Sequence, residues 1–403
     1  MYIYRVGVVG AGTMGAQIAQ VVSYAGLPVV LTDVTMDRAQ RGMEIVRRIY
    51  HARVERGKMT PEQAEEKMLL VSTGSDFTAL QDVDLVIEAV SENLALKRQV
   101  LHDLDAGCAP GAILASNTSA LSISALSAAT RRPGKVLGLH FFNPAYAMPL
   151  VEIIPGLATD PETVNDVVSF AESIRKLPIV VRECAGFLVN RLLMSYLNEA
   201  VLCVQEAAAS CKDIEQDMIA FGMPVGPFAL LDTVGLDISY DVARILFESY
   251  GPRMAPAALL AELVKAERFG VKNGHGFYEY EGPDTGMLER LIEKVRHETG
   301  HRNTPWKPTR LLFAMVNEAV LALQEGVASA RDIDLAMVAG IGFPKEKEGP
   351  LHYADALGID TVLAELELYG RTLGERFWPA PMLRRMVAAG FTGRAAGRGF
   401  FTY

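Results

Sequence analysis

Short apolar runs alternate with amphipathic stretches through the first part of the chain. The runs have the length and the β-branched content of strands, whereas the stretches between them repeat their apolar residues with a helical period. The first two strands are expected at Arg5–Gly10 and Pro28–Asp33, with a helix over Met14–Ala25 between them. A long charged helix is expected over Met36–Gly57, and Pro61 has the position of a first helical residue. Further strands are expected at Leu69–Ser72, Val83–Ala89, Ala112–Ser116, Val136–Phe142, Leu150–Pro155 and Pro178–Val181. This alternation predicts a doubly wound, mostly parallel α/β sheet.

The alternation stops near Arg182, and long amphipathic helices follow, for example over Phe187–Glu206 and Ala257–Glu267. This second part contains an internal repeat. The matching segments are Asn198–Glu206 with Asn317–Glu325, Asp213–Ile214 with Asp332–Ile333, Gly226–Asp237 with Gly349–Asp360, and Gly274–Tyr280 with Gly397–Tyr403. The offset is 119 residues at the first pair and 123 at the last, so the second copy carries four inserted residues.

The repeat predicts two tandem all-α domains after the sheet. We expect a sheet domain over residues 1–183, a first helical copy over 184–283, a linker over 284–306 and a second helical copy over 307–403. The join lies in the polar, Gly- and Pro-containing stretch Glu281–Pro308. A chain of 403 residues is too long for a single hydrophobic core, which agrees with this division.

Composition narrows the classes of function. The net charge of −9 argues against general nucleic-acid binding, which needs a positive field. No apolar run reaches the roughly 18 residues that span a bilayer, and the N-terminus leads directly into a strand, which leaves no room for a signal peptide. We therefore expect a cytoplasmic protein without a membrane partner. The cysteines (Cys108, Cys184, Cys203 and Cys211) show no metal-ligand spacing, so no metal site is expected and reduced, buried thiols are favoured.

A glycine-rich turn lies between the first expected strand and helix. It consists of Gly10, Ala11, Gly12, Thr13, Met14 and Gly15. In such a turn the first glycine allows the tight bend, the second lets the backbone approach a pyrophosphate, and the third lets helix and strand pack closely. Asp33 follows at the end of the second strand, where its carboxylate can accept hydrogen bonds from a ribose and would repel a 2′-phosphate. The pattern predicts a Rossmann-type domain that binds NAD. FAD is the main alternative, because it uses the same fingerprint.

Two further polar clusters follow expected strands. Small hydroxyl and amide side chains at Ser116–Ser119 would face the ligand crevice of an open sheet, or they would form a turn that caps a helix starting near Leu121. His140 ends another apolar strand, and Glu152 interrupts the next one. A buried carboxylate is costly unless it is paired, so we expect Glu152 to pair with His140. A histidine held in this way suits a general base, although a satisfied core histidine and an edge-strand glutamate are the alternatives.

Together these motifs resemble the 3-hydroxyacyl-CoA dehydrogenase family. The quoted segments are Gly-Ala-Gly-Thr-Met-Gly, Ser-Asn-Thr-Ser, Gly-Leu-His-Phe-Phe-Asn-Pro and Gly186-Phe-Leu-Val-Asn190-Arg191, and the resemblance covers essentially the whole chain. It implies that His140 is the catalytic base, that Glu152 orients it, and that Ser119 and Asn190 hold the reacting oxygen. It further implies an NAD site to which the glycine turn, Asp33, Glu88, Lys97, Asn117 and Asn143 contribute. The tandem helical domains resemble the dehydrogenase portion of bifunctional β-oxidation enzymes.

The implied substrate is an (S)-3-hydroxyacyl-CoA thioester, an anionic ligand that an acidic protein must meet with local cations. Arg53, Arg56 and Lys58 on and after the long charged helix are candidates, and an ordinary solvated helix face is the alternative. In the second copy Asn190 aligns with Thr309, so one active site per chain is expected. The two copies would form a pseudo-dimer within a monomer, or the chain would be a homodimer. A dehydrogenase of a free 3-hydroxy acid or sugar-derived acid, and a non-catalytic nucleotide-binding protein, are the alternative functions.

Overall fold

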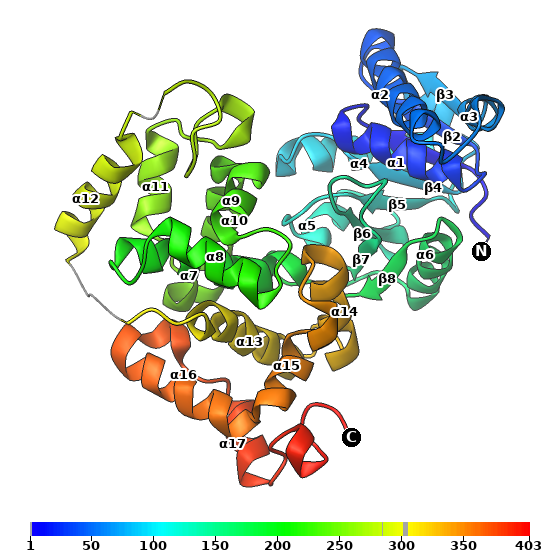
Figure 1. The fold of residues 1–403 in the computed structure, drawn as a ribbon. Coiled ribbons are helices and arrows are strands. Elements are labelled where there is room, and N and C mark those ends of the chain that lie inside the picture. The colour runs from blue at the N-terminus through cyan, green and yellow to red at the C-terminus, as the bar shows by residue number, and fades with distance from the viewer. Residues whose placement is uncertain (1, 284, 301–304) are drawn as a thin grey trace. The chain divides into compact units, whose positions relative to one another are not determined.

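The computed structural model describes residues 2–283, 285–300 and 305–403. The chain divides between Phe187 and Leu188 into two compact units, here called the sheet unit and the helical unit (Figure 1).

The sheet unit is built on eight strands in the spatial order β3-β2-β1-β4-β5-β6-β7-β8. Neighbouring strands are parallel except β6 and β7, which are antiparallel, so the predicted mostly parallel sheet is confirmed. The strands are β1 (Val6–Val9), β2 (Val29–Thr32), β3 (Val71–Gly74), β4 (Leu85–Glu88), β5 (Ile113–Ser116), β6 (Val136–Phe141), β7 (Leu150–Pro155) and β8 (Leu177–Val180). Strands β1, β2, β4 and β5 are buried along their whole length, as their unbroken apolar runs require.

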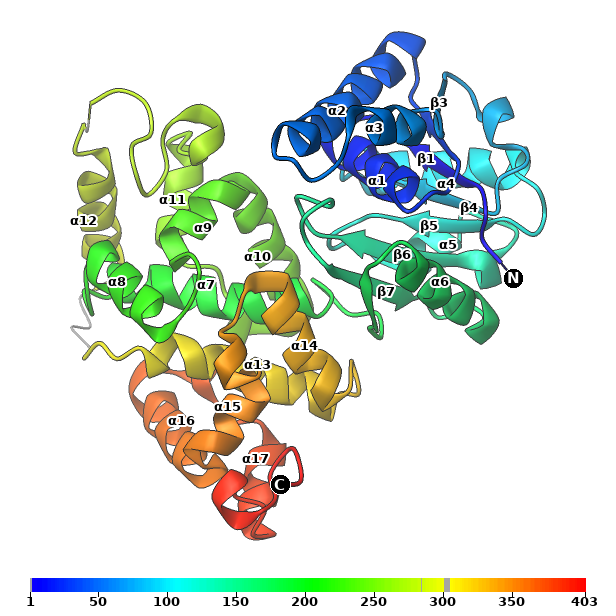
Figure 2. The same ribbon diagram turned by 45° about the vertical axis from the view of Figure 1, so that its right-hand side comes forward.

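Helices connect the parallel strands. They are α1 (Thr13–Tyr24), α2 (Met36–Glu55), α3 (Pro61–Met68), α4 (Leu94–Gly107), α5 (Ile123–Ser127) and α6 (Pro161–Ser173), with short 3₁₀ turns η1 (Phe77–Leu80) and η2 (Pro133–Lys135). From β1 the sheet grows toward β2 and β3 and then, from β4 onward, in the opposite direction. Because crossovers are right-handed, this reversal places helices on both faces and opens a crevice at the carboxyl ends of β1 and β4. The N-terminal part of the chain, coloured blue to cyan, shows this layering in Figure 2.

The helical unit contains the same five-helix arrangement twice. The first copy consists of α7 (Val189–Gln205), α8 (Cys211–Phe221), α9 (Pro227–Val234), α10 (Leu236–Tyr250) and α11 (Ala258–Lys265), with η3 (Gly251–Met254) and η4 (Val271–Asn273). The second consists of α13 (Thr309–Gln324), α14 (Ala330–Ile341), α15 (Pro350–Leu357), α16 (Ile359–Leu373) and α17 (Pro381–Ala388), with η5 (Lys345–Lys347), η6 (Glu375–Phe377) and η7 (Arg394–Ala396). The four inserted residues fall in the loop that contains η5.

Hydrogen bonds repeat between the copies as well. Asp232 accepts bonds from the backbone of Phe277 and Tyr278, and Asp355 accepts the equivalent bonds from Phe400 and Phe401. The amide of Asn198 bridges Ala255 and Ala257, and that of Asn317 bridges Trp378 and Ala380. The internal duplication read from the sequence is therefore present in the structure.

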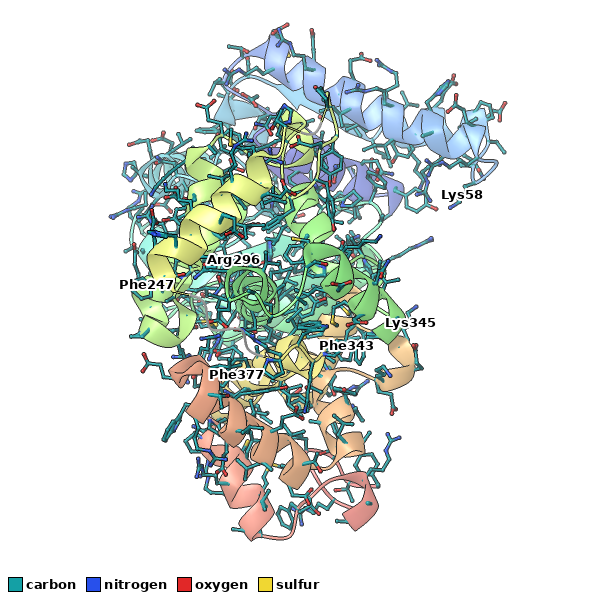
Figure 3. The ribbon with its side chains drawn as sticks, turned by 60° about the vertical axis from the view of Figure 1, so that its left-hand side comes forward. Lys58, Phe247, Arg296, Phe343, Lys345 and Phe377 are labelled. Carbon is teal, nitrogen blue, oxygen red and sulfur yellow. The ribbon has the colours of Figure 1, made fainter. Side chains whose placement is uncertain are left out.

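The two copies meet where α7 packs along α13, and most residues of both helices are buried. Two equivalent ion-pair clusters, here called the arginine clusters, cross this interface. Arg191 contacts Glu318 and Glu325 of the second copy, and Arg310 contacts Glu199 and Glu206 of the first. Arg253 and Arg376 complete the two clusters by contacting Glu318 and Glu199 respectively. Each cluster thus joins side chains that the repeat places in equivalent positions. Figure 3 shows Phe343 and Phe377, two fully buried aromatic side chains of the second copy.

The structure corrects some sequence predictions. The strand expected at Leu69–Ser72 is β3, Val71–Gly74, because Leu69 caps α3 by donating to Glu65 O. The stretch predicted as a polar join contains a helix, α12 (Met287–Thr299), whose apolar residues recur with a helical period. Positions 284 and 301–304 of the predicted linker lie outside the described residues. All four cysteines are free thiols, but only Cys108 and Cys203 are buried. Within the part of the chain that the structure describes, no helix is long and apolar enough to cross a membrane.

Candidate active site

The three glycines of the turn after β1 differ in whether the fold itself requires a glycine. Gly10 has a φ of +98°, and a Cβ there would lie 2.7 Å from the carbonyl oxygen of Ala89. A Cβ on Gly15 would lie 1.8 Å from Gly10 O, so these two glycines are required by the fold itself. A Cβ on Gly12 would meet nothing within 4 Å. The fold therefore has no need of a glycine at position 12, and this space is free for a ligand that approaches the backbone.

The start of helix α1 has the features of an anion site. Gly12 is its N-cap, no side chain caps the helix, and no acidic residue stands in the first turn. The backbone N–H groups of the first turn, which contains Thr13 and Met14, carry the positive end of the helix dipole. Together with the open space at Gly12, this arrangement fits the pyrophosphate of a dinucleotide.

Asp33 lies beside this turn, at the end of β2. Its Oδ2 accepts a hydrogen bond from Ala11 N and its Oδ1 accepts one from Val34 N, both at 2.8 Å. These bonds fix the carboxylate next to the glycine turn, where the predicted contact to a ribose would be made. A guanidinium nitrogen of Arg38 lies 3.9 Å from Asp33 Oδ1.

Glu88 and Lys97 form a buried pair behind the crevice. Lys97 Nζ lies 2.8 Å from Glu88 Oε1 and donates to the carbonyl of Val90, while Ser116 Oγ donates to Glu88 Oε2 at 2.6 Å. Neither side chain of the pair is more than 1% exposed. The resemblance to the family implies that both residues lie at the NAD pocket. In the structure both hold the backbone of Val90, which follows β4.

The cluster after β5 is held by side chains from two directions. Asn117 Oδ1 accepts a hydrogen bond from Phe141 N, which ties this loop to the end of β6. Glu92 Oε1 accepts from Ser119 N at 2.9 Å and from Thr118 Oγ1 at 2.5 Å. The loop that carries Ser119 is therefore fixed. Thr118 Oγ1 also accepts hydrogen bonds from Ala120 N and Leu121 N, so the turn that the sequence offered as the alternative is present, although the N-cap of α5 is Ser122.

His140 and Glu152 face each other across the antiparallel pair β6 and β7. They are register partners, and His140 Nδ1 lies 2.7 Å from Glu152 Oε2. Glu152 is fully buried and His140 is 5% exposed. The imidazole ring packs against the rings of Phe142 and Phe187, whose centroids lie 4.5 Å and 5.9 Å from its own. Because the carboxylate holds Nδ1, the other ring nitrogen, Nε2, is left to exchange a proton with a ligand.

Two side chains hold the loop after His140, which contains a cis peptide bond between Asn143 and Pro144. Gln17, on α1, donates to Asn143 Oδ1 and accepts from Ala145 N. Lys176 Nζ, at the start of β8, donates to Ala145 O at 2.5 Å and to Met148 O at 2.6 Å. Burial lowers the pKa of Lys176 to about 8. These contacts hold Asn143 beside the glycine-turn helix.

The basic residues proposed for coenzyme A lie at the end of α2. The guanidinium of Arg53 stacks on the ring of Tyr24, 4.2 Å from its centroid, and its Nε is buried without a hydrogen-bond partner. Arg56 and Lys58 are exposed beyond the helix end, and Lys58 is labelled in Figure 3. Arg53 is therefore part of the packed surface, whereas the other two are ordinary exposed cations.

Asn190 belongs to the helical unit, where it lies in the first turn of α7. Its counterpart Thr309 donates a hydrogen bond to Glu365 and contacts the hydroxyl of Tyr369 within the second copy. The second copy thus uses this position for internal packing.

Four residues that fix the site were not singled out from the sequence: Gln17, Glu92, Lys176 and Glu183. The carboxylate of Glu183 accepts bonds from Ser122 Oγ at 2.6 Å and Ser124 N at 3.0 Å, and so anchors α5. A polar residue within the apolar pattern of α1 was a signal for Gln17. For the other three, the sequence gives no comparable signal, because their partners are distant in the chain.

Comparison with known proteins identifies the family of both units. Residues 5–184 match the model of the 3-hydroxyacyl-CoA dehydrogenase NAD-binding domain, and residues 186–280 and 308–403 both match the model of the C-terminal domain of that family. The chain belongs to the 3-hydroxyacyl-CoA dehydrogenase family. The sheet unit corresponds to the NAD-binding domain of the family, and the helical unit contains the C-terminal domain of the family twice.

Several named relatives are similar to this chain over most of its length. The fatty acid oxidation complex subunit alpha of Shewanella sp. (strain MR-7) is 38% identical over 393 residues, which are 94% of this chain and 55% of that protein. The chain thus spans about half the length of the curated relatives it matches. The crystal structure of 3-hydroxybutyryl-CoA dehydrogenase from Escherichia coli is similar over 96% of this chain and 99% of that chain, with a TM-score of 0.87 and 30% identity. The (S)-3-hydroxybutyryl-CoA dehydrogenase of Ralstonia eutropha is 37% identical over 70% of this chain and all of that chain, with a TM-score of 0.68.

Within the described residues, no group of three or more His, Cys, Asp or Glu side chains is placed to hold a metal ion.

Proposed function

We propose that this chain oxidises (S)-3-hydroxyacyl-CoA to 3-oxoacyl-CoA with NAD, and catalyses the reverse reduction, with His140 as the general base. The observation that carries the proposal is the buried His140–Glu152 pair, 2.7 Å apart, in a domain of the NAD-binding class. The names of the Escherichia coli and Ralstonia eutropha relatives suggest a 3-hydroxybutyryl thioester as the first substrate to test.

In this proposal the hydroxyl proton of the substrate passes to Nε2 of His140. The Glu152 carboxylate holds Nδ1–H, which fixes the tautomer with a free Nε2 and stabilises the imidazolium that forms. The buried carboxylate stabilises this cation, because the attraction between opposite charges at this distance is stronger inside the protein than in water. In the reverse direction, the imidazolium returns its proton to the ketone oxygen. Ser119 and Asn190 are proposed to donate hydrogen bonds to that oxygen as charge develops on it.

The residues of the glycine turn fit the cofactor. The N-terminus of α1, with Gly12, Thr13 and Met14, would hold the pyrophosphate, and Asp33 would bind the adenosine ribose. Glu88, Lys97, Asn117 and Asn143 would complete the pocket, the first two by supporting the backbone after β4. When bound, NAD accepts the hydride of the oxidised carbon.

The coenzyme A moiety needs cations from an acidic protein. Arg56 and Lys58 are exposed and can reach phosphate groups, while Arg53 is held on Tyr24 with an unused Nε–H donor. We propose that these three residues contribute to coenzyme A binding.

The test is NADH formation with purified full-length chain across 3-hydroxyacyl-CoA esters of increasing acyl length. The matching free 3-hydroxy acids and NADP serve as controls. The proposal expects turnover with the thioesters and NAD, and at least a hundredfold lower kcat/KM with the free acids. Equal turnover of the free acids would favour the alternative of a free-acid dehydrogenase, and NAD binding without turnover of any compound would favour a non-catalytic protein. The cytoplasmic location and the choice between monomer and homodimer stay predictions.

A further inference from the structure

Each helical copy has a groove, and the two grooves overlap in part. The first-copy groove has a volume of about 480 Å³ and the second-copy groove about 440 Å³. Three pairs of equivalent residues line both grooves: Val204 and Leu323, Arg268 and Phe391, and Phe277 and Phe400. The two grooves therefore share one part of the repeated surface.

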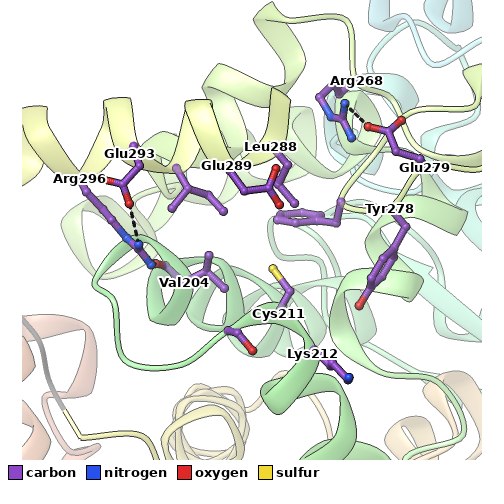
Figure 4. A pocket seen from close by; sticks show the side chains of 13 residues that line it. Val204, Cys211, Lys212, Arg268, Tyr278, Glu279, Leu288, Glu289, Glu293 and Arg296 are labelled. Carbon is purple, nitrogen blue, oxygen red and sulfur yellow. Dashed lines mark hydrogen bonds and ion pairs between the residues drawn. The ribbon is translucent and has the colours of Figure 1, made fainter. Parts of the chain in front are cut away.

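Helix α12 covers the first-copy groove, as Figure 4 shows. Its Leu288 and Ile292 side chains line the groove, and its Arg296 donates to the carbonyl of Val204, near the end of α7. Lys294 forms an ion pair with Glu262 on α11 at 2.5 Å. This helix lies outside both stretches that match the family's C-terminal domain, 186–280 and 308–403. The covering helix is therefore an addition to the repeat rather than a part of it.

The apolar residues that line the second-copy groove are more exposed than their counterparts in the first copy. In the first copy Leu259, Leu263 and Phe277 are at most 3% exposed. Their counterparts Met382, Met386 and Phe400 are all partly exposed in the second copy. The same packing surface, buried where α12 lies on it, is thus accessible in the second copy.

The charges at the rims of the grooves also differ. The counterpart of Glu262, which pairs with Lys294 of α12, is Arg385. The counterpart of His275 is Arg398, whose guanidinium stacks on Phe391, 3.9 Å from the ring centroid. Arg385 and Arg398 both line the second-copy groove, and the structure gives Arg385 no carboxylate partner among the described residues. A position that binds a lysine in the first copy is therefore set to bind an acidic residue in the second.

From these observations we infer that the second-copy groove binds an amphipathic helix of a partner protein. The apolar ridge of that helix packs over Met382, Met386 and Phe400, in the way that α12 packs on the first copy. Its acidic side chains face Arg385 and Arg398. Two copies of this chain would not bind each other through their second-copy grooves, because Arg385 and Arg398 of one copy would face the same arginines of the other.

The test uses peptides that copy α12, labelled with a fluorophore and titrated with the full-length chain. One peptide has the sequence of Gly286–Thr299, and the other carries Lys294→Glu at the position that meets Arg385. Fluorescence anisotropy is expected to show that the Lys294→Glu peptide binds at least tenfold more tightly, which corresponds to about 1.4 kcal/mol. In an Arg385→Glu variant of the chain this preference should reverse.

A Lys345→Glu variant is the matched control, because it makes the same charge change at an exposed position that does not line the groove. It should bind both peptides as the unmodified chain does. The inference is overturned if neither peptide binds, or if Arg385→Glu leaves the preference unchanged. It is also overturned if sedimentation shows that the chain self-associates and that Arg385→Glu abolishes this, since the occupant would then be a second copy.

Discussion

Replacement of Arg310 by methionine removes the cation of one of the two arginine clusters. Arg310 is fully buried, and its Nε lies 2.6 Å from Glu199 Oε1. Burial alone would lower the pKa of this guanidinium, but the carboxylates of Glu199 and Glu206 outweigh it and raise the pKa above its ordinary value. The arginine is thus firmly charged, and its loss leaves two carboxylates, 3% and 7% exposed, with less compensation.

The expected loss of stability in the Arg310→Met variant depends on the contacts that its two glutamates keep. Breaking a buried ion pair from one side costs about 3–5 kcal/mol. Arg376 still contacts both carboxylates in the variant, so the lower end, about 3 kcal/mol, is expected. The equivalent change Arg191→Met should cost only about 1–2 kcal/mol, because the side chain of Glu325 is 41% exposed and water can solvate it, while Arg253 still contacts the buried Glu318. Two positions related by the repeat are therefore expected to differ.

Urea unfolding followed by tryptophan fluorescence measures this directly. Both tryptophans of the chain, Trp306 and Trp378, lie in the helical unit, so the signal reports on that unit alone. As a control, Glu199→Gln and Glu206→Gln added to Arg310→Met should recover at least half of the lost stability, since they remove the uncompensated charges. The reasoning is refuted if Arg310→Met costs less than about 1 kcal/mol, if the Arg191 variant costs as much, or if the glutamine substitutions recover nothing.

Three further predictions concern the sheet unit. Gly12→Ala should leave the melting temperature unchanged but weaken NAD binding at least tenfold in calorimetric titration. Gly15→Ala should instead lower the melting temperature, because its Cβ would lie 1.8 Å from Gly10 O. Equal effects of the two changes on the melting temperature would contradict the assignment of Gly12 to the ligand. Asp33→Ser should raise the ratio of kcat/KM with NADP to kcat/KM with NAD by about a hundredfold, because the carboxylate that repels the 2′-phosphate of NADP is lost and Arg38 stays beside the site. An unchanged ratio would show that Asp33 does not select the cofactor. Burial lowers the pKa of Lys176 to about 8, so between pH 8 and about 10.4 the unfolded chain binds more protons than the folded chain. The free energy of unfolding of the wild-type chain, relative to that of Lys176→Met, should therefore rise with pH across this window in urea unfolding followed by circular dichroism. A difference that stays flat or falls would exclude this explanation.

Much of the sheet unit could be predicted because its determinants are local. The strands are unbroken apolar runs, and the glycine turn, its following helix and Asp33 occupy fixed offsets in one βαβ unit. The pairing of His140 with Glu152 could also be predicted, since a short loop joins their two consecutive strands and the antiparallel pairing of these strands places the two residues opposite each other. A buried glutamate in an apolar strand needs a partner, and only one was near in sequence.

Contacts between distant segments could not be predicted in the same way. The repeat identifies Arg191 and Arg310 as equivalent, but that each pairs with glutamates of the other copy depends on how α7 and α13 pack. The contacts of Lys176 with two loop carbonyls leave no pattern in the sequence, because any backbone carbonyl can accept. Helix α12 was missed because its surrounding glycines, prolines and charges are typical of a linker, and its apolar ridge is short.

If His140 is the general base for oxidation of a 3-hydroxyacyl thioester, its removal should slow catalysis and spare cofactor binding. The experiment compares the 403-residue chain with its His140→Ala variant, measuring NADH formation from (S)-3-hydroxybutyryl-CoA at saturating NAD and the dissociation constant of NAD by titration. We expect kcat to fall by about 10²–10⁴-fold while the NAD dissociation constant changes less than about twofold. Turnover of the variant at the rate of the unmodified chain would show that His140 is not the base.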